Sequence, residues 1–521
     1  MFFKEKFNLK NCLLICLLGL FSFCINYYYG FIGVMPMDNF VLYNGGYRVL
    51  NGYIPFTDYW LVTGPLLDYL NAFFFLINGV SWKSYIIHSS IFNLIISIST
   101  YNLLVNLGLK KNFSFFYSVL FSILFYPVVG TPFVDHHSTF FLIFSFYYFI
   151  LGINKNNQYY FILVPFLLCL SFLSKQTPAA YGLIAICPLI LIHFFFNQKQ
   201  IKKTLLSLIY GTVVSILFLF LFLFFTEINF LNFYDQYILY AKNIGDYRFS
   251  NYNFNLINVI IKYKFISILL VCLTIILIKL CKKNNKNIKA IFTIITIMTL
   301  SCLLIFHQFY TLNQNYIFFL IPLLTGIVHI FYKEVFTNKF FLFIFIFLCI
   351  YATTKYHIRF NEHRKFNELE KVDLSKAIDA EILTKDLKGL KWITAGYQNN
   401  PKDEINNLMN VMQILSKDQS NKALITDYQF LAPSLKIYDF SPNQWHHPSV
   451  SFPLENQQYY QKYKSFFIEN LKKNNIDFIY ETTDKDESII ELVINKECLL
   501  KQRVTEILIK FEIVKNCNEF K

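Results

Sequence analysis

The residues best suited to chemistry gather in one segment, residues 36–79, directly after the first long apolar run. This segment holds three acids and one arginine, Asp38, Asp58, Asp68 and Arg48. Residues 1–355 contain only nine acids, and three of them lie here. Charge held against a membrane is costly, so intramembrane and juxtamembrane charges usually serve a function. The pattern indicates a functional loop in which a carboxylate could accept a proton and a cation could stabilise an anion.

Further polar residues stand at the ends of later apolar runs: Asp135 with His136 and His137, Lys175, Arg248 and His307. Each also has a structural interpretation. Asp38 or Asp135 could cap a helix, and Asp58 could belong to a turn. Lys175 could extend to lipid headgroups. Adjacent helical positions do not face one site, so His136 and His137 cannot both bind one ligand, and packing is an alternative for each.

Composition indicates a membrane protein. The 521 residues are 55% hydrophobic and their mean hydropathy is +0.41, above the range of soluble proteins. Residues 1–355 carry 24 Lys and Arg against nine acids, whereas residues 356–521 carry 23 against 24. The excess positive charge therefore lies between apolar runs, where it reports topology. This distribution argues against a nucleic-acid partner.

The apolar runs predict eleven membrane spans. With the N-terminus inside, the lysines concentrate on the inner segments and most acids fall outside, which is the expected asymmetry. We therefore predict a multi-pass protein of a bacterial plasma membrane, with a cytoplasmic N-terminus and an extracytoplasmic C-terminus. No small-residue cleavage site follows the first run, so we expect it to remain as a span. The predicted spans are residues 12–33, 84–106, 113–130, 136–153, 158–174, 178–196, 204–226, 256–279, 290–308, 315–332 and 339–354.

Residues 356–521 differ in character and predict a soluble α/β or α+β domain after a membrane domain of residues 1–355. The runs KALITDY and IDFIYET are β-like, and the runs ELVI and EILIKFEIV that follow them are apolar-rich. The segment APSLKIYDFSPNQWHHPSVSFP is rich in Pro and aromatic residues, so we expect a long loop that faces the membrane part.

Cysteine usage follows the same division. Nine of the eleven cysteines lie in or beside apolar runs, where they act as small apolar residues. The remaining two, Cys498 and Cys517, lie in the predicted outer domain, where an oxidising compartment favours a disulfide. Two buried free thiols are the alternative. No Cys/His spacing indicates structural zinc.

Several motifs resemble those of GT-C glycosyltransferases that use polyprenyl-phosphate sugars. The loop reads Asp38, Tyr47-Arg48, Asn51-Gly52, PFTD at 55–58, GPL at 64–66 and Gly79. It is similar to the first outer loop of the aminoarabinose transferase and protein mannosyltransferase type, glycosyltransferase family 39. SKQTP at 174–178 resembles the segment of that family whose lysine contacts the carrier phosphate. NYIFFLIPLL at 315–324 resembles its late motif.

The resemblance implies a helical polytopic GT-C-like fold over residues 1–355 and sugar transfer to a lipid, glycan or protein acceptor at the outer face. It implies Asp38 as the catalytic base and Asp135 as a second acid of the site. Asp58 is the alternative candidate for the catalytic base. Lys175 would bind the donor phosphate. The family's Lys-Pro-Pro-Leu segment reads TGPL at 63–66 here, so Arg48 or Arg248 is expected to replace one cation. The substrate is expected to contact Tyr47, His136, His307 and Tyr316. A cofactor is not required by the pattern, and a divalent metal is left open.

Other classes remain as alternatives. A secondary transporter should carry charges near the bilayer midplane and two related halves with broken helices, neither of which is evident. A lipid-linked glycan polymerase or ligase, or a non-catalytic scaffold that displays the outer domain, would have similar composition. The scaffold would tolerate loss of Asp38, whereas the transferase would not.

Overall fold

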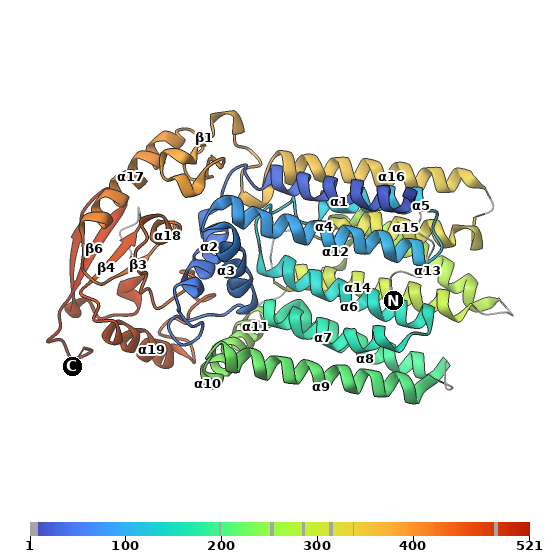
Figure 1. Cartoon of the computed structure of the whole chain (residues 1–521), viewed down its shortest axis with the longest axis horizontal. Helices are drawn as coiled ribbons and strands as arrows, with labels where there is room; N and C mark the ends of the chain where they lie inside the picture. Colours follow the sequence, from blue (N-terminus) through green and yellow to red (C-terminus); the bar gives the residue numbers. More distant parts are fainter. Residues whose placement is uncertain are drawn as a thin grey trace.

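The computed structural model describes residues 9–196, 200–250, 255–283, 287–311, 316–336, 338–483 and 488–520, without the side chains of residues 247–250 and 310. A bundle of long apolar helices forms one end of the molecule, and a strand-containing part forms the other (Figure 1). Two helices of residues 36–79, the segment that the sequence predicts as the first outer loop, lie between them.

Nine helices of the described ranges are long and apolar enough to cross a membrane. The other two predicted spans coincide with shorter helices, α5 (Lys111–Leu124) and α7 (Gln158–Ser174), which pack within the bundle. The span predicted at 256–279 is instead divided into α12 (Leu256–Lys262) and α13 (Lys264–Lys282), because Tyr263 leaves the helical conformation. The other long elements are α1 (Leu9–Tyr29), α4 (Trp82–Asn106), α6 (Val134–Lys155), α8 (Gln176–Phe196), α9 (Ile201–Phe225), α14 (Ile288–Tyr310), α15 (Leu320–Phe331) with short 3₁₀ turns at Ile317–Phe319 and Tyr332–Glu334, and α16 (Lys339–His357).

Successive long helices run in opposite directions along the bundle, so the start of one lies near the end of the previous one. The start of α6, the end of α7 and the end of α14 therefore meet at the end of the bundle that faces the strands. This arrangement brings together polar residues that are far apart in the sequence: Asp135, Lys175 and His307.

The first outer loop forms two helices, α2 (Pro36–Leu50) and α3 (Leu66–Asn78), which pack against each other. Pro36 occupies the first turn of α2, where its missing N–H and fixed φ are compatible with a helix. Asp38 also lies in that turn, where the positive end of the helix dipole favours a carboxylate. The loop thus holds Asp38 on a rigid element beside the bundle.

The C-terminal part contains a four-stranded sheet of order β3-β4-β6-β5, in which β3 and β4 are parallel and the other pairs are antiparallel. The β-like runs KALITDY and IDFIYET contain β3 and β4, as predicted. The apolar-rich run EILIKFEIV contains β6, whereas the ELVI run begins within a 3₁₀ turn of residues 490–492. Helices α17 (Pro401–Lys417), α18 (Leu431–Leu435) and α19 (Tyr460–Lys473) accompany strands β3 (Lys422–Ile425), β4 (Phe478–Thr482), β5 (Leu499–Arg503) and β6 (Leu508–Ile513).

The chain directly after α1 joins the C-terminal part through backbone hydrogen bonds. The Gly33 N–H donates to Lys391 O at 2.9 Å, beside the small antiparallel pair β1 (Ile378–Asp379) and β2 (Lys391–Trp392). Gly33 has φ +66°, and a Cβ there would lie 2.3 Å from the Leu369 side chain. This position therefore requires glycine for both backbone conformation and space.

The outer loop and the C-terminal part share a buried core. Phe40 of α2 contacts Trp82, Trp392 and Phe430, which come from the bundle and from the C-terminal part. The buried Arg48 guanidinium forms an ion pair with Asp439 at 2.6 Å and donates to Asn443 O at 3.0 Å. Shared apolar burial and a buried ion pair fix the C-terminal part on α2.

Cys498 and Cys517 are joined as a disulfide, with their Cα atoms 5.4 Å apart. The bond connects the start of β5 to the segment that follows β6. The disulfide therefore holds the residue that precedes β5 against the segment that follows β6.

Candidate active site

A cavity of about 820 Å³ lies where the bundle, α2 and the C-terminal part meet. Four residues that the sequence singled out line it: Asp38, Asp135, Lys175 and Tyr316. Its other walls include the apolar side chains Phe172, Tyr181, Tyr237 and Ile238. The cavity thus combines charged groups with an apolar surface, as a site for an amphipathic ligand requires.

Asp38 lies in this cavity, and its carboxylate has no partner among the described residues. Its carboxylate makes no hydrogen bond or ion pair with any side chain that the structure describes. Burial, with the Asp135 carboxylate nearby, raises the pKa of the Asp38 carboxyl to about 7, while Lys175 acts in the opposite direction. A carboxylate is suited to accept a proton when its pKa is near neutrality and its oxygens are not engaged by protein groups.

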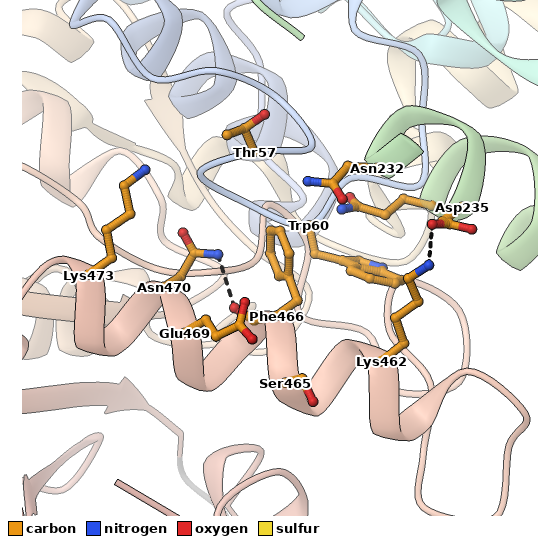
Figure 2. A pocket seen from close by; sticks show the side chains of 11 residues that line it. Thr57, Trp60, Asn232, Asp235, Lys462, Ser465, Phe466, Glu469, Asn470 and Lys473 are labelled. Atoms are coloured by element: carbon orange, nitrogen blue, oxygen red, sulfur yellow. Dashed lines mark hydrogen bonds and ion pairs between the residues drawn. The ribbon is translucent and has the colours of Figure 1, made fainter. Parts of the chain in front are cut away.

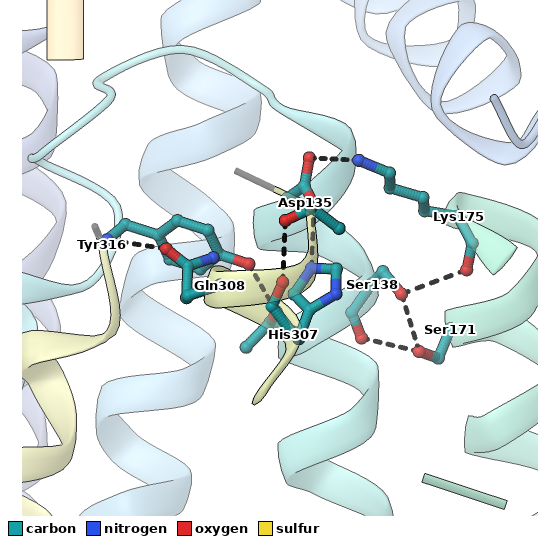
Figure 3. A network of polar contacts seen from close by, with 9 residues as sticks. Asp135, Ser138, Ser171, Lys175, His307, Gln308 and Tyr316 are labelled. Carbon is teal, nitrogen blue, oxygen red and sulfur yellow. Dashed lines mark hydrogen bonds and ion pairs between the residues drawn. The ribbon is translucent and has the colours of Figure 1, made fainter. Parts of the chain in front are cut away.

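Asp135 is the centre of a buried polar network (Figure 3). One carboxylate oxygen accepts a hydrogen bond from the Lys175 ammonium at 2.6 Å, and the other lies 3.1 Å from His307 Nε2. The Asp135 side chain is 1% exposed and the Lys175 side chain is 19% exposed, so the lysine is the more accessible member of the pair. The pair fixes a positive charge at the cavity wall. His307 itself lies behind Asp135 and does not line the cavity.

The backbone around Lys175 is positioned by the outer loop. Gly64 N–H donates to Ser174 O at 3.1 Å, and a Cβ on Gly64 would lie 1.9 Å from Leu173 O. Only glycine permits this approach of the loop to the end of α7. The Gln176 amide then donates to Val62 O and to Tyr237 O, each at 2.8 Å. The TGPL segment therefore supports Lys175 through its backbone, without supplying a cation.

The two adjacent histidines diverge, as their spacing predicts. The His137 ring contacts His88 and Tyr126 inside the bundle. The His136 ring packs on Tyr316, with ring centroids 4.2 Å apart, and is fully buried. Tyr316 lines the cavity and its hydroxyl lies 3.2 Å from Thr139 Oγ1. His136 therefore supports the wall of the cavity from behind and does not contact its interior.

Three residues expected at the site lie elsewhere. Arg48 is held by Asp439, and the Tyr47 hydroxyl donates to Ile437 O at 3.4 Å. The Asp58 carboxylate accepts from Ile54 N at 2.8 Å and pairs with Lys473 at 2.9 Å. None of the three lines the cavity, because the outer loop turns them toward the C-terminal part. The side chain of Arg248 lies outside the described residues.

The cavity also contains residues that the sequence did not single out. Trp445, His447 and Val450 come from the Pro- and aromatic-rich segment of the C-terminal part, which confirms that this segment faces the membrane part. Glu368, Asp246 and Lys242 add charge at the wall. The dense aromatic and histidine content of residues 432–453 was the available signal for Trp445 and His447. Nothing in the sequence distinguished Glu368 from other surface acids.

The described residues contain no group of three or more His, Cys, Asp or Glu arranged to hold a metal ion. Asp135, the acid best placed for such a role, already has both oxygens engaged by Lys175 and His307. The Asp135 carboxylate is thus satisfied within the protein.

One comparison with known families bears on this arrangement. Residues 62–224 match the family described as dolichyl-phosphate-mannose-protein mannosyltransferase. The matched range contains Asp135 and Lys175 and excludes Asp38. Together with the nine candidate spans, the match supports a polytopic membrane glycosyltransferase of the GT-C superfamily. No curated protein matches the chain.

Proposed function

We propose that this protein transfers a sugar from a polyprenyl-phosphate carrier to an acceptor hydroxyl at the outer face of the membrane. The observation that carries the proposal is the cavity in which an unpartnered carboxylate, Asp38, lies near a held ammonium, Lys175. We assign residues 1–355 to a catalytic membrane domain and residues 356–521 to an extracytoplasmic domain. In this assignment the N-terminus is cytoplasmic and the membrane is a bacterial plasma membrane.

The reaction is a single displacement. The acceptor oxygen attacks the anomeric carbon, a new C–O bond forms, and the bond from that carbon to the phosphate oxygen breaks. Its electron pair leaves with the polyprenyl phosphate. The Asp38 carboxylate accepts the proton of the acceptor hydroxyl, which raises the nucleophilicity of the oxygen as it attacks. Attack on the face opposite the phosphate inverts the anomeric centre.

Lys175 is proposed to stabilise the departing phosphate. An ammonium has three donors, and Asp135 uses one of them, so two remain for phosphate oxygens. Asp135, bound in turn to His307, holds the ammonium in place before the substrate arrives. A cation fixed in advance stabilises developing charge without reorganisation at the moment of reaction. The apolar wall formed by Phe172, Tyr181 and Ile238 suits the first part of the carrier tail.

Replacing Asp38 by Asn tests the proposal. Asn keeps the shape of the side chain but cannot accept the proton, so we expect transfer to fall at least 100-fold, the usual contribution of a general base. Asp58→Asn is the matched control, because it removes a carboxylate of the same loop that lies outside the cavity. The measurement is the initial rate of polyprenyl phosphate release by purified protein in lipid nanodiscs. Near-normal turnover in Asp38→Asn would refute the role of this residue.

A further inference from the structure

A second cavity, of about 440 Å³, lies on the other side of the outer loop (Figure 2). One wall is the loop segment that carries Thr57 and Trp60, and a second is the π-helix η2 (Tyr234–Tyr240) with the preceding turn α10 (Phe230–Phe233). The third wall is α19 of the C-terminal part, from which the Phe466 ring and the Asn470 amide extend toward the loop. This cavity is distinct from the one that contains Asp38.

Three buried polar atoms at this cavity have no hydrogen-bond partner among the described residues: Thr57 Oγ1, Trp60 Nε1 and Asn470 Oδ1. Trp60 is 2% exposed and Asn470 is 5% exposed. A buried polar group without a partner costs on the order of 1–3 kcal/mol, and such groups are rare in native proteins. Thr57 and Trp60 lie on one wall and Asn470 on the facing wall. Because each atom is closed to solvent in this structure, a ligand with several hydroxyl groups would pair with these atoms once the side chains turn toward the cavity.

The charges of the cavity indicate that this ligand is neutral. Lys462 forms an ion pair with Asp235, and Lys473 pairs with Asp58 at 2.9 Å. Both ammonium groups are therefore already matched by carboxylates. Glu469 adds an exposed carboxylate with no cation partner among the pairs that the structure describes. An anionic ligand would meet this carboxylate and two neutralised lysines, so the cavity disfavours phosphate.

We propose that this second cavity binds a neutral saccharide, as a sugar unit of the acceptor that is remote from the reacting hydroxyl. A sugar ring has C–H faces and a rim of hydroxyls. The Phe466 ring, packed edge to face on the buried Trp60 ring with centroids 5.6 Å apart, provides apolar surface for the C–H groups. Thr57, Trp60 and Asn470 provide partners for the hydroxyls. Aromatic walls with a few placed polar groups are typical of small-molecule sites.

The two cavities share their dividing wall. Thr57 and Trp60 line the second cavity, whereas Val62 and Thr63, two or three residues further on, line the first. Likewise Asp235 and Gln236 of η2 line the second, and Tyr237 and Ile238 line the first. Two residues span at most about 7 Å, so the cavities are close neighbours. The assignment to the acceptor rests on the proposed function, whereas saccharide binding itself does not.

The experiment measures saccharide binding to the full-length protein in lipid nanodiscs by saturation-transfer difference NMR. The probes are glucose, galactose, mannose, N-acetylglucosamine and their common disaccharides. Asn470→Ala removes the unpartnered acceptor. Asn474→Ala is the matched control, because each of these amides donates to the carbonyl four residues earlier and only Asn470 lines the cavity. Trp60→Phe keeps an aromatic ring but removes the Nε1 donor.

We expect at least one probe to bind the wild type and the Asn474→Ala variant equally. We expect its dissociation constant to rise about fivefold in Asn470→Ala and in Trp60→Phe, the effect of one lost hydrogen bond. Binding by none of the probes, or equal binding by all four proteins, would overturn the proposal. Asp38→Asn should bind the probe as the wild type does. If Asp38→Asn also retained transfer, the proposed function would fail while the saccharide site stood.

Discussion

The Asp38 carboxyl should govern the pH dependence of sugar transfer. Burial and Asp135 raise its pKa to about 7, and the residue can act as a base only when it is ionised. The rate should therefore be low at acidic pH and rise to a plateau above neutrality. With a pKa of 7, about 9% of the enzyme is active at pH 6 and about 91% at pH 8, so kcat/KM should increase roughly tenfold over this interval.

The neighbours of Asp38 provide the internal test of this explanation. Lys175 lowers the pKa of Asp38, whereas Asp135, Asp427 and Glu368 raise it. Lys175→Gln removes the positive charge, so the rising limb should move to higher pH even though the plateau also falls. His447 lines the same cavity, so its replacement provides a control for the pH profile. His447→Gln should leave the limb in place, which separates the histidine from the carboxylate.

The assay is the initial rate of carrier phosphate release at donor concentrations well below KM, from pH 5.5 to 8.5, at constant ionic strength. Under these conditions kcat/KM reports the groups of the free enzyme. A flat profile, or a rising limb that disappears in His447→Gln, would refute the assignment of the limb to Asp38. A limb that stays in place in Lys175→Gln would show that the two groups do not interact in the working enzyme.

Two further predictions concern single contacts. Lys175→Ala should raise the donor KM roughly 10- to 100-fold, which is the effect of a lost charged hydrogen bond. Lys242→Ala removes an exposed ammonium of the same cavity and should change the donor KM little. Equal effects of the two substitutions would contradict a specific phosphate contact. Peptide mapping without reductant should recover Cys498 linked to Cys517, and replacing both by Ser should lower the free energy of unfolding of the C-terminal part by about 3 kcal/mol, as for a loop of this length. Recovery of both as free thiols would exclude the bond.

Apolar length was sufficient to predict most of the membrane part. Long runs of Ile, Leu and Phe have no alternative to a helix in lipid, so ten of the predicted spans coincide with single helical runs. The division between α12 and α13 escaped prediction, because Tyr263 interrupts the helix through local backbone conformation without a Pro or Gly signal. The apolar-rich ELVI run begins within a 3₁₀ turn, residues 490–492, and is not part of the described four-stranded sheet.

The site was partly predictable for a similar reason. Acids and lysines beside apolar spans are rare, so Asp38, Asp135 and Lys175 were identifiable from scarcity and motif, and the structure brings all three to one cavity. Arg48 and Asp58 satisfied the same criterion but pair with Asp439 and Lys473, which lie almost 400 or more residues away in the sequence. Local patterns contain no information on such partners. A charged residue beside an apolar span therefore indicates that a partner exists, but it does not show whether that partner is a protein group or the substrate.

The Arg48 ion pair explains why the C-terminal part belongs to the site. Asp439 holds Arg48 and also accepts from Asn44 at 2.9 Å, while Gln444 donates to Asp68 at 2.9 Å. These contacts fix the segment that continues to Trp445 and His447, and both of those side chains line the cavity of Asp38. Breaking a buried pair by removing one partner typically costs 3–5 kcal/mol, because a charge is left uncompensated. In the proposed function the loop charges thus serve two purposes: Asp38 is available to substrate, and Arg48 fixes the wall that encloses it.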